Sequence, residues 1–543
     1  MKKYISHIVL GILIICMMGA SLWSSGGIIL LDYIATDHAS IPWFQNGWYL
    51  IPQIPSSILG YEWGTKVSFV TILILSAYLG ILLARRISDL CAPWYRTMLE
   101  IFGGVFFLTN PFAYERMMVQ PVIYLGTILI GYALYFLLFS RDSKLTLRRA
   151  WLIGLTLGIA LNVFLHASYM ILAILALYSI LFVRSLRDTR SIAYIGGIIL
   201  VLNLNWILAP LFGIRNSVTT ISSFSLANFE AFATQALAPL EVFGTNILLY
   251  GFWWEQFANH YANVDFLSSL WYVAGFMMLS IVLYGFSRVY TLSKKLFIFC
   301  LLLSTLSLTL GVGITSPITA PLTHFLIEYA PLFAWYREPQ KWIWLLMIVE
   351  GIGFLFGVAF ILERWGRDRV VRSSLCMTIL ILFLVWSPGS LFGYHGQLRT
   401  TVYPRGFEEL REILLETQKP GLLPSSQWQK VLALPWHSYL GCSWTGRPTI
   451  SNPIASLMSP HSLVSSDNIE AWSILYSNSI DPVSESIEAF LRLHDFAPLW
   501  SLGFTHILLM RECANSESYA WLDTMSSCSV AYDDAAVRLY SCR

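Results

Sequence analysis

Two carboxylates, Asp32 and Asp37, follow an apolar run that begins near the N-terminus, in the stretch LDYIATDHASIPW. A carboxylate at a bilayer boundary can contact a lipid headgroup and an aqueous substrate together, and it can take a proton from an attacking hydroxyl. The alternative is an ordinary interfacial acid that marks the end of a membrane span. Position alone favours that alternative, so the other charged motifs have to decide.

A pair of opposite charges, Glu115 and Arg116, stands in the stretch FFLTNPFAYERMMVQP. The Asn-Pro step at the end of an apolar run predicts a helix break there, because proline cannot continue the preceding helix. The pair then falls in a very short outer turn. Two adjacent charges beside a membrane need partners, and the plainest interpretation is a salt-bridged turn that fixes two spans.

A second group of charges precedes a later apolar run, in FAWYREPQKWIWLL. It consists of Arg337, Glu338 and Lys341, and aromatic residues surround it. Arginine suits bidentate contact with phosphate and lysine supplies a point charge, so a lipid phosphate would explain the group. An interfacial anchor of basic side chains and an aromatic belt would explain it equally well, and the residues alone leave both interpretations open.

The elements that must position these residues are membrane helices. The chain has 543 residues, of which 56% are hydrophobic and 12% are charged. Its mean hydropathy is +0.62, whereas about 25% of the residues of an average soluble chain are charged. A net charge of +2 gives no support to nucleic-acid binding. The composition therefore predicts a polytopic membrane protein.

Apolar windows long enough to cross a membrane predict eleven spans. They lie near 5–31, 63–84, 96–112, 119–139, 150–165, 168–183, 191–211, 267–287, 296–312, 342–362 and 373–393. The first could also belong to a secretory signal peptide, but the length of the run favours an uncleaved span.

The basic residues predict the orientation of these spans. With a cytoplasmic N-terminus, the inner segments hold 19 basic residues and the outer segments before residue 394 hold 5, which is the positive-inside pattern. Treating 150–183 as one span would reverse every later loop and destroy this bias. We therefore expect a helical hairpin there, with His166 at its outer turn, in a multi-pass protein of the cell membrane.

The tail predicts a separate domain outside the membrane. Its helical patterns are RGFEELREILLET and SIEAFLRLHDFAPLWSLG, and its strand patterns are KVLALPW, THILLMR and AAVRLYSCR. The expected architecture is thus an all-α membrane domain of about eleven helices over 1–393 and an extracytoplasmic α/β domain over 394–543. Four cysteines of the tail permit two disulfides in three pairings: Cys442, Cys513, Cys528 and Cys542.

The stretches LLDYIATDHA, NPFAYERMMVQ and WYREPQK together resemble prokaryotic polytopic membrane proteins with the GT-C glycosyltransferase fold. Arabinofuranosyltransferase-like and oligosaccharide-processing members are nearest in pattern. Their second motif reads Asn-Pro-Phe-x-Tyr-Asp/Glu-Arg, with Gly-Gln a few residues on, and Val119 stands here where glycine is usual. The residues that match this motif are Asn110, Pro111, Phe112, Tyr114, Glu115, Arg116 and Gln120.

The resemblance implies roles for the charged residues. GT-C enzymes use a sugar carried on a polyprenyl or dolichyl phosphate and a carboxylate base in the first outer loop. Asp32 matches that base and Asp37 is the second candidate, while Arg337 and Lys341 would hold the donor phosphate. Further polar groups would line the substrate cavity: Glu115, Arg116, His166, Glu338 and His38. No metal is required if the cations carry the phosphate, although Asp32, Asp37 and His38 could bind Mg²⁺ or Mn²⁺.

The expected activity is transfer of a hexosyl or pentosyl group, with inversion, to an extracytoplasmic glycan, lipid or protein acceptor. A flippase or transporter for lipid-linked glycans and a non-catalytic assembly factor are the alternatives. Transporters tend to carry charges or broken helices at mid-membrane, often in two related halves. Here the notable charges lie at span ends on one side and no symmetry between halves is visible, which favours surface chemistry.

Overall fold

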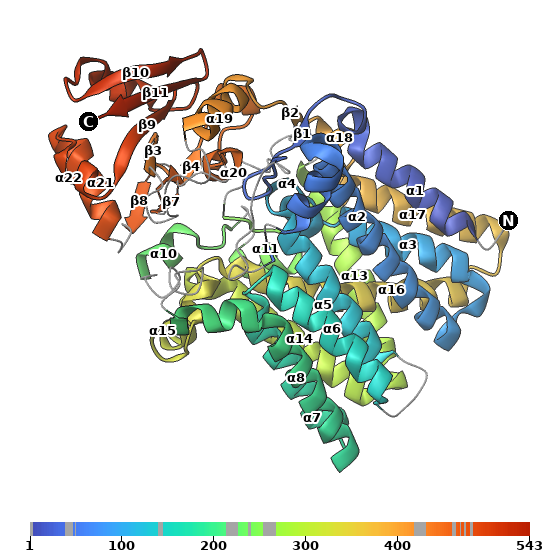
Figure 1. Cartoon of the computed structure of the whole chain (residues 1–543). Coiled ribbons are helices and arrows are strands. Elements are labelled where there is room, and N and C mark those ends of the chain that lie inside the picture. The colour runs from blue at the N-terminus through green and yellow to red at the C-terminus, as the bar shows by residue number, and fades with distance from the viewer. Residues whose placement is uncertain are drawn as a thin grey trace. The chain divides into compact units, whose positions relative to one another are not determined.

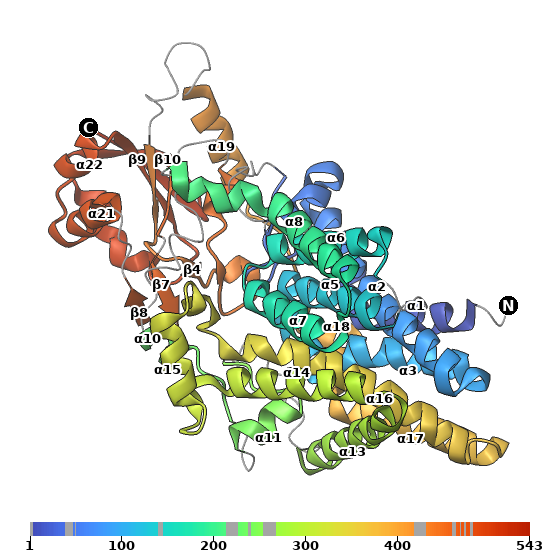
Figure 2. The same ribbon diagram turned by 90° about the horizontal axis from the view of Figure 1, so that it is seen from below.

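The computed structural model is mostly helical and divides into two compact units (Figures 1 and 2). The helical unit consists of Met1–Leu22, Trp43–Trp48 and Phe69–Leu398. The sheet unit consists of Trp23–Pro42, Tyr49–Ser68 and Arg399–Arg543. The residues described are 4–37, 47–48, 50–139, 145–212, 226–236, 241–253, 268–417, 430–458, 463–466, 468–471, 474–477 and 482–543.

Helical segments lie in all eleven of the predicted spans, but the first of them ends at Leu22, well before the end of the predicted window 5–31. Within the described ranges, eight helical segments are long and apolar enough to cross a membrane, so the chain is a multi-pass membrane protein. These segments are Ile5–Leu22, Leu50–Cys91, Pro121–Leu138, Leu186–Phe212, Leu270–Leu292, Lys294–Thr315, Pro339–Trp365 and Arg369–Trp386. The corresponding helices are α1 (Ile5–Met18), α2 (Leu50–Cys91), α5 (Pro121–Leu138), α8 (Leu186–Leu208), α13 (Ser268–Leu292), α14 (Lys294–Val312), α16 (Ile343–Trp365) and α17 (Arg369–Trp386).

The three remaining windows hold shorter helices, so a total of eleven crossings stays a prediction. They are α3 (Arg96–Thr109), α6 (Leu147–Val163) and α7 (Ala167–Phe182), with 14, 17 and 16 residues. The break between α6 and α7 gives the two helices that the charge pattern predicts for 150–183, and His166 immediately precedes α7.

Helix α2 is longer than predicted because it begins before the apolar window and changes direction within its first part. Gly60 adopts φ 78° and ψ 153° inside it, a conformation open to glycine but strained for a residue with a Cβ. The sequence prediction of a span starting at 63 therefore describes the part of α2 that follows this break.

The sheet unit is built on a mixed five-stranded sheet with strand order β10-β11-β9-β3-β6. Strand β3 pairs in parallel with β9 and β6, whereas β11 pairs antiparallel with β9 and β10. The strands are β3 (Lys430–Leu434), β6 (Leu463–Val464), β9 (Phe504–Met510), β10 (Cys528–Asp533) and β11 (Val537–Cys542). The three predicted tail strands are thus β3, β9 and β11, and the predicted helices are α19 (Gly406–Thr417) and α21 (Pro482–Leu493), which α22 (Ala497–Ser501) follows.

Two hydrophobic cores lie on the two faces of this sheet. Along β3, Val431 and Ala433 belong to the core that includes α19, whereas Leu432 and Leu434 belong to the core that includes α21 and α22. Successive side chains of a strand point to opposite faces. The continuous apolar run KVLAL therefore follows from a strand that is buried on both sides.

The first outer segment of the sequence is part of the sheet unit. Strand β1 (Gly27–Ile28) pairs antiparallel with β2 (Thr400–Thr401). A Cβ on Gly26, whose φ is +88°, would lie 2.5 Å from the carbonyl oxygen of Thr401. Glycine is therefore needed where the two segments meet, and residues from both ends of the chain build one compact unit.

Candidate active site

The first predicted carboxylate, Asp32, lies at the corner of a tight turn in the sheet unit. Leu30 and Tyr33 flank the turn and exchange backbone hydrogen bonds of 3.1 and 3.3 Å. The Tyr33 hydroxyl donates to the carbonyl of Thr65 at 2.7 Å, and the Ser451 N–H donates to the carbonyl of Leu31 at 2.7 Å. The backbone around Asp32 is therefore held from three sides.

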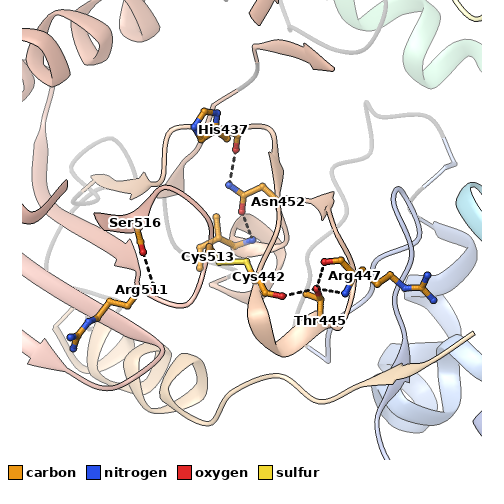
Figure 3. Close-up of a disulfide and its surroundings, with 9 residues drawn as sticks. His437, Cys442, Thr445, Arg447, Asn452, Arg511, Cys513 and Ser516 are labelled. Atoms are coloured by element: carbon orange, nitrogen blue, oxygen red, sulfur yellow. Dashed lines mark hydrogen bonds between the residues drawn. A yellow bond between two sulfur atoms is a disulfide. The ribbon is translucent and has the colours of Figure 1, made fainter. Parts of the chain in front are cut away.

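The carboxylate of Asp32 is half-buried and has a hydroxyl partner from the tail. The Tyr439 hydroxyl donates a hydrogen bond of 3.1 Å to Oδ1 of Asp32. Tyr439 lies on β4 (Tyr439–Leu440), which pairs with β5 (Ile450–Ser451). Three residues on, Cys442 forms a disulfide with Cys513, and Asn452 donates to the carbonyl of His437 at 3.1 Å (Figure 3).

The second predicted carboxylate, Asp37, is exposed and serves the backbone. Its Oδ1 accepts a hydrogen bond of 2.6 Å from the N–H of Tyr61, directly after Gly60. The N–H groups at the start of a helix lack partners in the helix itself, and aspartate is among the residues that best accept from them. Asp37 therefore stabilises the part of α2 that begins after the break.

In the helical unit, Asn110 and Pro111 form a break between two helices, and the second of these helices carries Glu115 and Arg116. Asn110 ends α3 and caps α4 (Pro111–Val119), because its side chain accepts from the N–H of Ala113 at 2.9 Å. Pro111 occupies the first position of α4, where its missing N–H leaves no donor unsatisfied. The predicted helix break is confirmed, although a nine-residue helix follows it in place of a short turn.

Arg116 is completely buried and bridges α4 to the segment 336–341. Its Nη1 donates to Oε1 of Gln120 at 2.6 Å and lies 3.3 Å from Oε2 of Glu338, while its Nη2 donates to Oε1 of Gln340. Gln340 in turn donates to Oε2 of Glu115 at 2.7 Å. The pair of opposite charges thus meets its partners more than 220 positions away in the sequence.

Lys341 is also buried, and its ammonium has two partners. Nζ lies 2.9 Å from Oε1 of Glu338 and 3.1 Å from Nε2 of His166. Phe164 stacks on the imidazole of His166 with ring centroids 4.5 Å apart. Since an ammonium can only donate, His166 accepts through Nε2 and is therefore neutral. Glu338 is shared by Lys341 and Arg116, so one carboxylate compensates two buried cations.

Arg337 stands between two residues whose side chains are fixed. On one side, Tyr336 is buried, donates to the carbonyl of His166 and accepts from the N–H of Tyr169. On the other side is the ion-paired Glu338. The guanidinium carbon of Arg337 lies 4.5 Å from the ring centroid of Phe232, and the side chain is half-buried.

The network holds its members in definite protonation states. Burial acts to raise the pKa of Glu338, but the Lys341 ammonium and the Arg116 guanidinium outweigh burial and bring the pKa below its usual range. Burial, reinforced by Lys341, lowers the pKa of His166 well below its ordinary value. At neutral pH the carboxylate is therefore charged and the imidazole is neutral.

The structure brings five predicted cavity or phosphate residues into one network: Glu115, Arg116, His166, Glu338 and Lys341. Asp32 and Asp37 belong to the sheet unit, and His38 lies outside the described residues. Two residues of these sites, Gln340 and Tyr439, are not predicted from the sequence. The position of Gln340 between Glu338 and Lys341 gave a signal for it, whereas Tyr439 lies in a segment with no distinctive pattern.

Among the described residues, no group of three or more His, Cys, Asp and Glu side chains is placed to hold a metal ion. The two carboxylates proposed as ligands already accept hydrogen bonds, Asp32 from Tyr439 and Asp37 from Tyr61. Mg²⁺ and Mn²⁺ prefer oxygen ligands. Among the described residues, Asp32 and Asp37 each provide one carboxylate without a second acid or histidine grouped with it, and one carboxylate does not form the set of oxygen ligands that these ions prefer.

No protein-family model and no curated protein sequence matches the chain. Among solved structures, the chain is similar to the arabinofuranosyltransferase AftD from Mycobacteria, with a TM-score of 0.63 and 10% identity. This match covers 100% of the chain and 40% of AftD. It confirms the resemblance to GT-C membrane glycosyltransferases at the level of the fold, and the chain spans less than half the length of AftD.

Two further structures match with lower scores. One is the oligosaccharyltransferase AglB from Archaeoglobus fulgidus in complex with an inhibitory peptide and a dolichol-phosphate, with a TM-score of 0.48 and 10% identity over 100% of this chain and 74% of AglB. The other is ArnT from Cupriavidus metallidurans bound to undecaprenyl phosphate, with a TM-score of 0.46 and 12% identity over 99% of this chain and 97% of ArnT.

Proposed function

We propose that the chain is a glycosyltransferase of the GT-C type, which moves a sugar from a polyprenyl-phosphate donor to an acceptor on the extracytoplasmic side. The observation that carries this proposal is the buried network in which Glu338 binds both Arg116 and Lys341. It fixes the segment around Arg337 at the start of a membrane helix. The fold shared with an arabinofuranosyltransferase supports the same class of reaction.

The donor phosphate is assigned to Arg337. Its guanidinium is a planar fork that matches two phosphate oxygens, and the fixed residues on either side limit its backbone freedom. Lys341 serves as a positioning residue, because its buried ammonium already contacts Glu338 and His166. When the bond between the sugar and the phosphate breaks, the guanidinium stabilises the negative charge that develops on the leaving phosphate.

The base is assigned to Asp32. Its carboxylate takes the proton from the acceptor hydroxyl, the hydroxyl oxygen forms a bond to the anomeric carbon, and the bond from that carbon to the phosphate oxygen breaks. The nucleophile and the leaving group lie on opposite sides of the anomeric carbon, so its configuration inverts. Tyr439 orients the carboxylate by donating to Oδ1.

Asp37 is assigned a positioning role, since its oxygen accepts from the backbone of α2. The two carboxylates can therefore be separated by matched substitutions. Asparagine keeps an acceptor oxygen in both positions, so it preserves the hydrogen bond from Tyr439 and the helix cap at Tyr61. It removes the negative charge and with it the capacity of a base.

The test is transfer by the purified full-length protein, in liposomes, from a panel of hexosyl and pentosyl polyprenyl phosphates. We expect Asp32→Asn to lower kcat by roughly 10²- to 10⁴-fold, while Asp37→Asn stays within about threefold of the parent because the cap survives. Full activity of Asp32→Asn would remove this residue from the base role. Donor binding by the parent without any turnover would overturn the enzymatic proposal.

A further inference from the structure

A second cluster of charges lies at the other end of α16, far from Glu338. The cavity there has a volume of about 340 Å³ and is lined by the ends of α13 and α16 and the turn after α16. Its lining residues are Tyr284, Arg288, Phe360, Glu363, Arg364 and Arg367. Since α16 has 23 residues, its two ends are about 35 Å apart, so this cavity is separate from the network of Glu338.

Glycines fix the two helices that form the cavity at close range. A Cβ on Gly285 of α13 would lie 1.9 Å from the carbonyl oxygen of Gly353, and one on Gly357 would lie 2.1 Å from the carbonyl oxygen of Ile281. The two backbones therefore touch beside Tyr284 on α13 and about one to two turns before Phe360 on α16. This contact sets the distance between Tyr284 and Arg288 on one helix and Phe360 on the other.

The cavity carries an excess of positive charge. Arg288, Arg364 and Arg367 contribute three positive charges and Glu363 one negative charge, which leaves a formal charge of +2. Over the described part of the chain, none of these four side chains forms an ion pair within the 4.0 Å limit. Clustered arginines of like sign repel one another, so an anion in the cavity would be favourable.

Aromatic rings hold one arginine in place. The guanidinium carbon of Arg288 lies 5.2 Å from the ring centroid of Tyr284 and 5.6 Å from that of Phe360, and Nη2 donates to the Tyr284 hydroxyl at 3.1 Å. Arg288 is exposed, yet both rings and the hydroxyl restrict its guanidinium to the mouth of the cavity. Among the described residues, the hydrogen bond from Arg288 to Tyr284 uses one of the N–H donors of the three guanidinium groups, each of which has five, so a ligand with several acceptor oxygens suits the cavity.

We propose that this cavity binds the phosphate of an anionic phospholipid in the cytoplasmic leaflet. Three guanidinium groups around one cavity suit a phosphate diester, and basic pockets between membrane helices on this side bind such headgroups. Exposed apolar side chains stand next to the cavity residues in sequence, with Leu283 at 59% and Trp365 at 53% exposure. They offer surface along which the acyl chains can lie.

The test is native mass spectrometry of the full-length protein with phosphatidylglycerol, cardiolipin or phosphatidylcholine. We expect the anionic lipids to bind more tightly than phosphatidylcholine. Replacing Arg288, Arg364 and Arg367 together by Gln should weaken that binding by roughly tenfold to a hundredfold. The matched control replaces Arg184, Arg187 and Arg190 by Gln, which removes the same charge from exposed positions outside the cavity.

Two further measurements, on a milder variant and with competing soluble phosphates, keep the test decisive. The milder variant Arg288→Lys retains the charge but loses the planar fork, so it should bind anionic lipid more weakly than the parent even if the triple variant does not fold. Millimolar inorganic phosphate and glycerol 3-phosphate should not displace the lipid. Equal losses in the triple variant and its control, or full displacement by the soluble phosphates, would overturn the proposal. Because no sugar donor is present, this result is independent of the proposed transferase activity.

Discussion

Glu338 is the centre of the buried network in the helical unit, because it is the countercharge for both Arg116 and Lys341. Its side chain is 4% exposed and that of Arg116 is 0% exposed. Buried ion pairs contribute little net stability when intact, since desolvation offsets the attraction. Removing one partner, however, leaves an uncompensated charge, and this asymmetry makes the network sensitive to single substitutions.

We expect Glu338→Gln to lower the free energy of unfolding by about 3–5 kcal/mol, because two buried cations lose their carboxylate. The measurement is resistance of the detergent-solubilised protein to thermal and SDS unfolding. Asp533→Asn is the control, since it removes a carboxylate that is paired with Arg538 at 2.7 Å but is 45% exposed. It should cost no more than about 1 kcal/mol. Equal effects of the two substitutions would contradict the network described above.

Acidification should destabilise the protein through His166. A histidine whose pKa is lowered by folding binds fewer protons in the folded state, so stability falls as the pH drops below the ordinary pKa of about 6.5. Glu338 has a lowered pKa and loses its contribution only below about pH 4.3. Between pH 6.5 and 5 the thermal midpoint of the parent should therefore fall more than that of His166→Gln. Parallel profiles of the two proteins would show that His166 titrates freely.

The sequence could predict which residues form the network but not how they pair. The motifs NPFAYER and WYREPQK contain all its acids and bases except His166, and the helical hairpin predicted from charge placed His166 at a turn on the same side. The pairing depends on contacts between segments more than 220 positions apart. In particular, the sequence predicts that Lys341 contacts phosphate, and tertiary structure adds two partners of its ammonium, Glu338 and His166.

At the scale of the element, close helix packing depends on a few glycines of α13 and α16. Without a hydrophobic driving force between helices in lipid, association relies on close backbone approach at small residues. Gly285, Gly353 and Gly357 provide that approach. A hydropathy window cannot detect the role of these glycines, because the window reports the length of a span and not the face of the helix that meets another helix.

A substitution at one of these glycines should separate the two helices. In Gly285→Ala the new Cβ would meet the backbone of Gly353, which cannot move as a flexible side chain would, so we expect a loss of about 1–3 kcal/mol. The control is Gly197→Ala in α8, where no atom lies within 4 Å of an added Cβ. There alanine should stabilise the helix by up to about 1 kcal/mol. The thermal midpoints of the two variants should therefore shift in opposite directions, and a rise for Gly285→Ala would refute this packing.

Over the whole molecule, the sequence predicts where helices and strands occur better than which of them build one unit. The strands β3, β9 and β11 and the helices α19 and α21 follow from the periodicity of their apolar residues. The pairing of β1 with β2 does not, because each strand has two residues and carries no pattern of its own. Consequently the sequence predicts a membrane domain that includes residues 23–37, whereas the compact sheet unit includes them.

The disulfides of the sheet unit should differ in their accessibility to reductant. The first joins Cys442 to Cys513 and the second joins Cys528 to Cys542. Cys442 and Cys513 are both buried and belong to the core beside α19, whereas Cys528 is partly exposed at the edge strand β10. Access to sulfur limits thiol–disulfide exchange. Under graded dithiothreitol, alkylation and mass spectrometry should therefore detect Cys528 and Cys542 before the other pair. Simultaneous labelling of all four would contradict this order.

The hydrogen bond between Tyr439 and Asp32 has a consequence for biosynthesis. A ribosome adds about 5–20 residues per second, so the turn at residues 30–33 emerges tens of seconds before the strands that hold it. Thr65 follows within seconds, but until Tyr439 and Ser451 have been translated, the hydroxyl partner of Asp32 and the backbone partner of Leu31 do not exist. A nascent chain that ends before these residues would thus insert its helices while the carboxylate of Asp32 lacks its partner, and the transfer that we propose would begin only after residues 439–451 have been made.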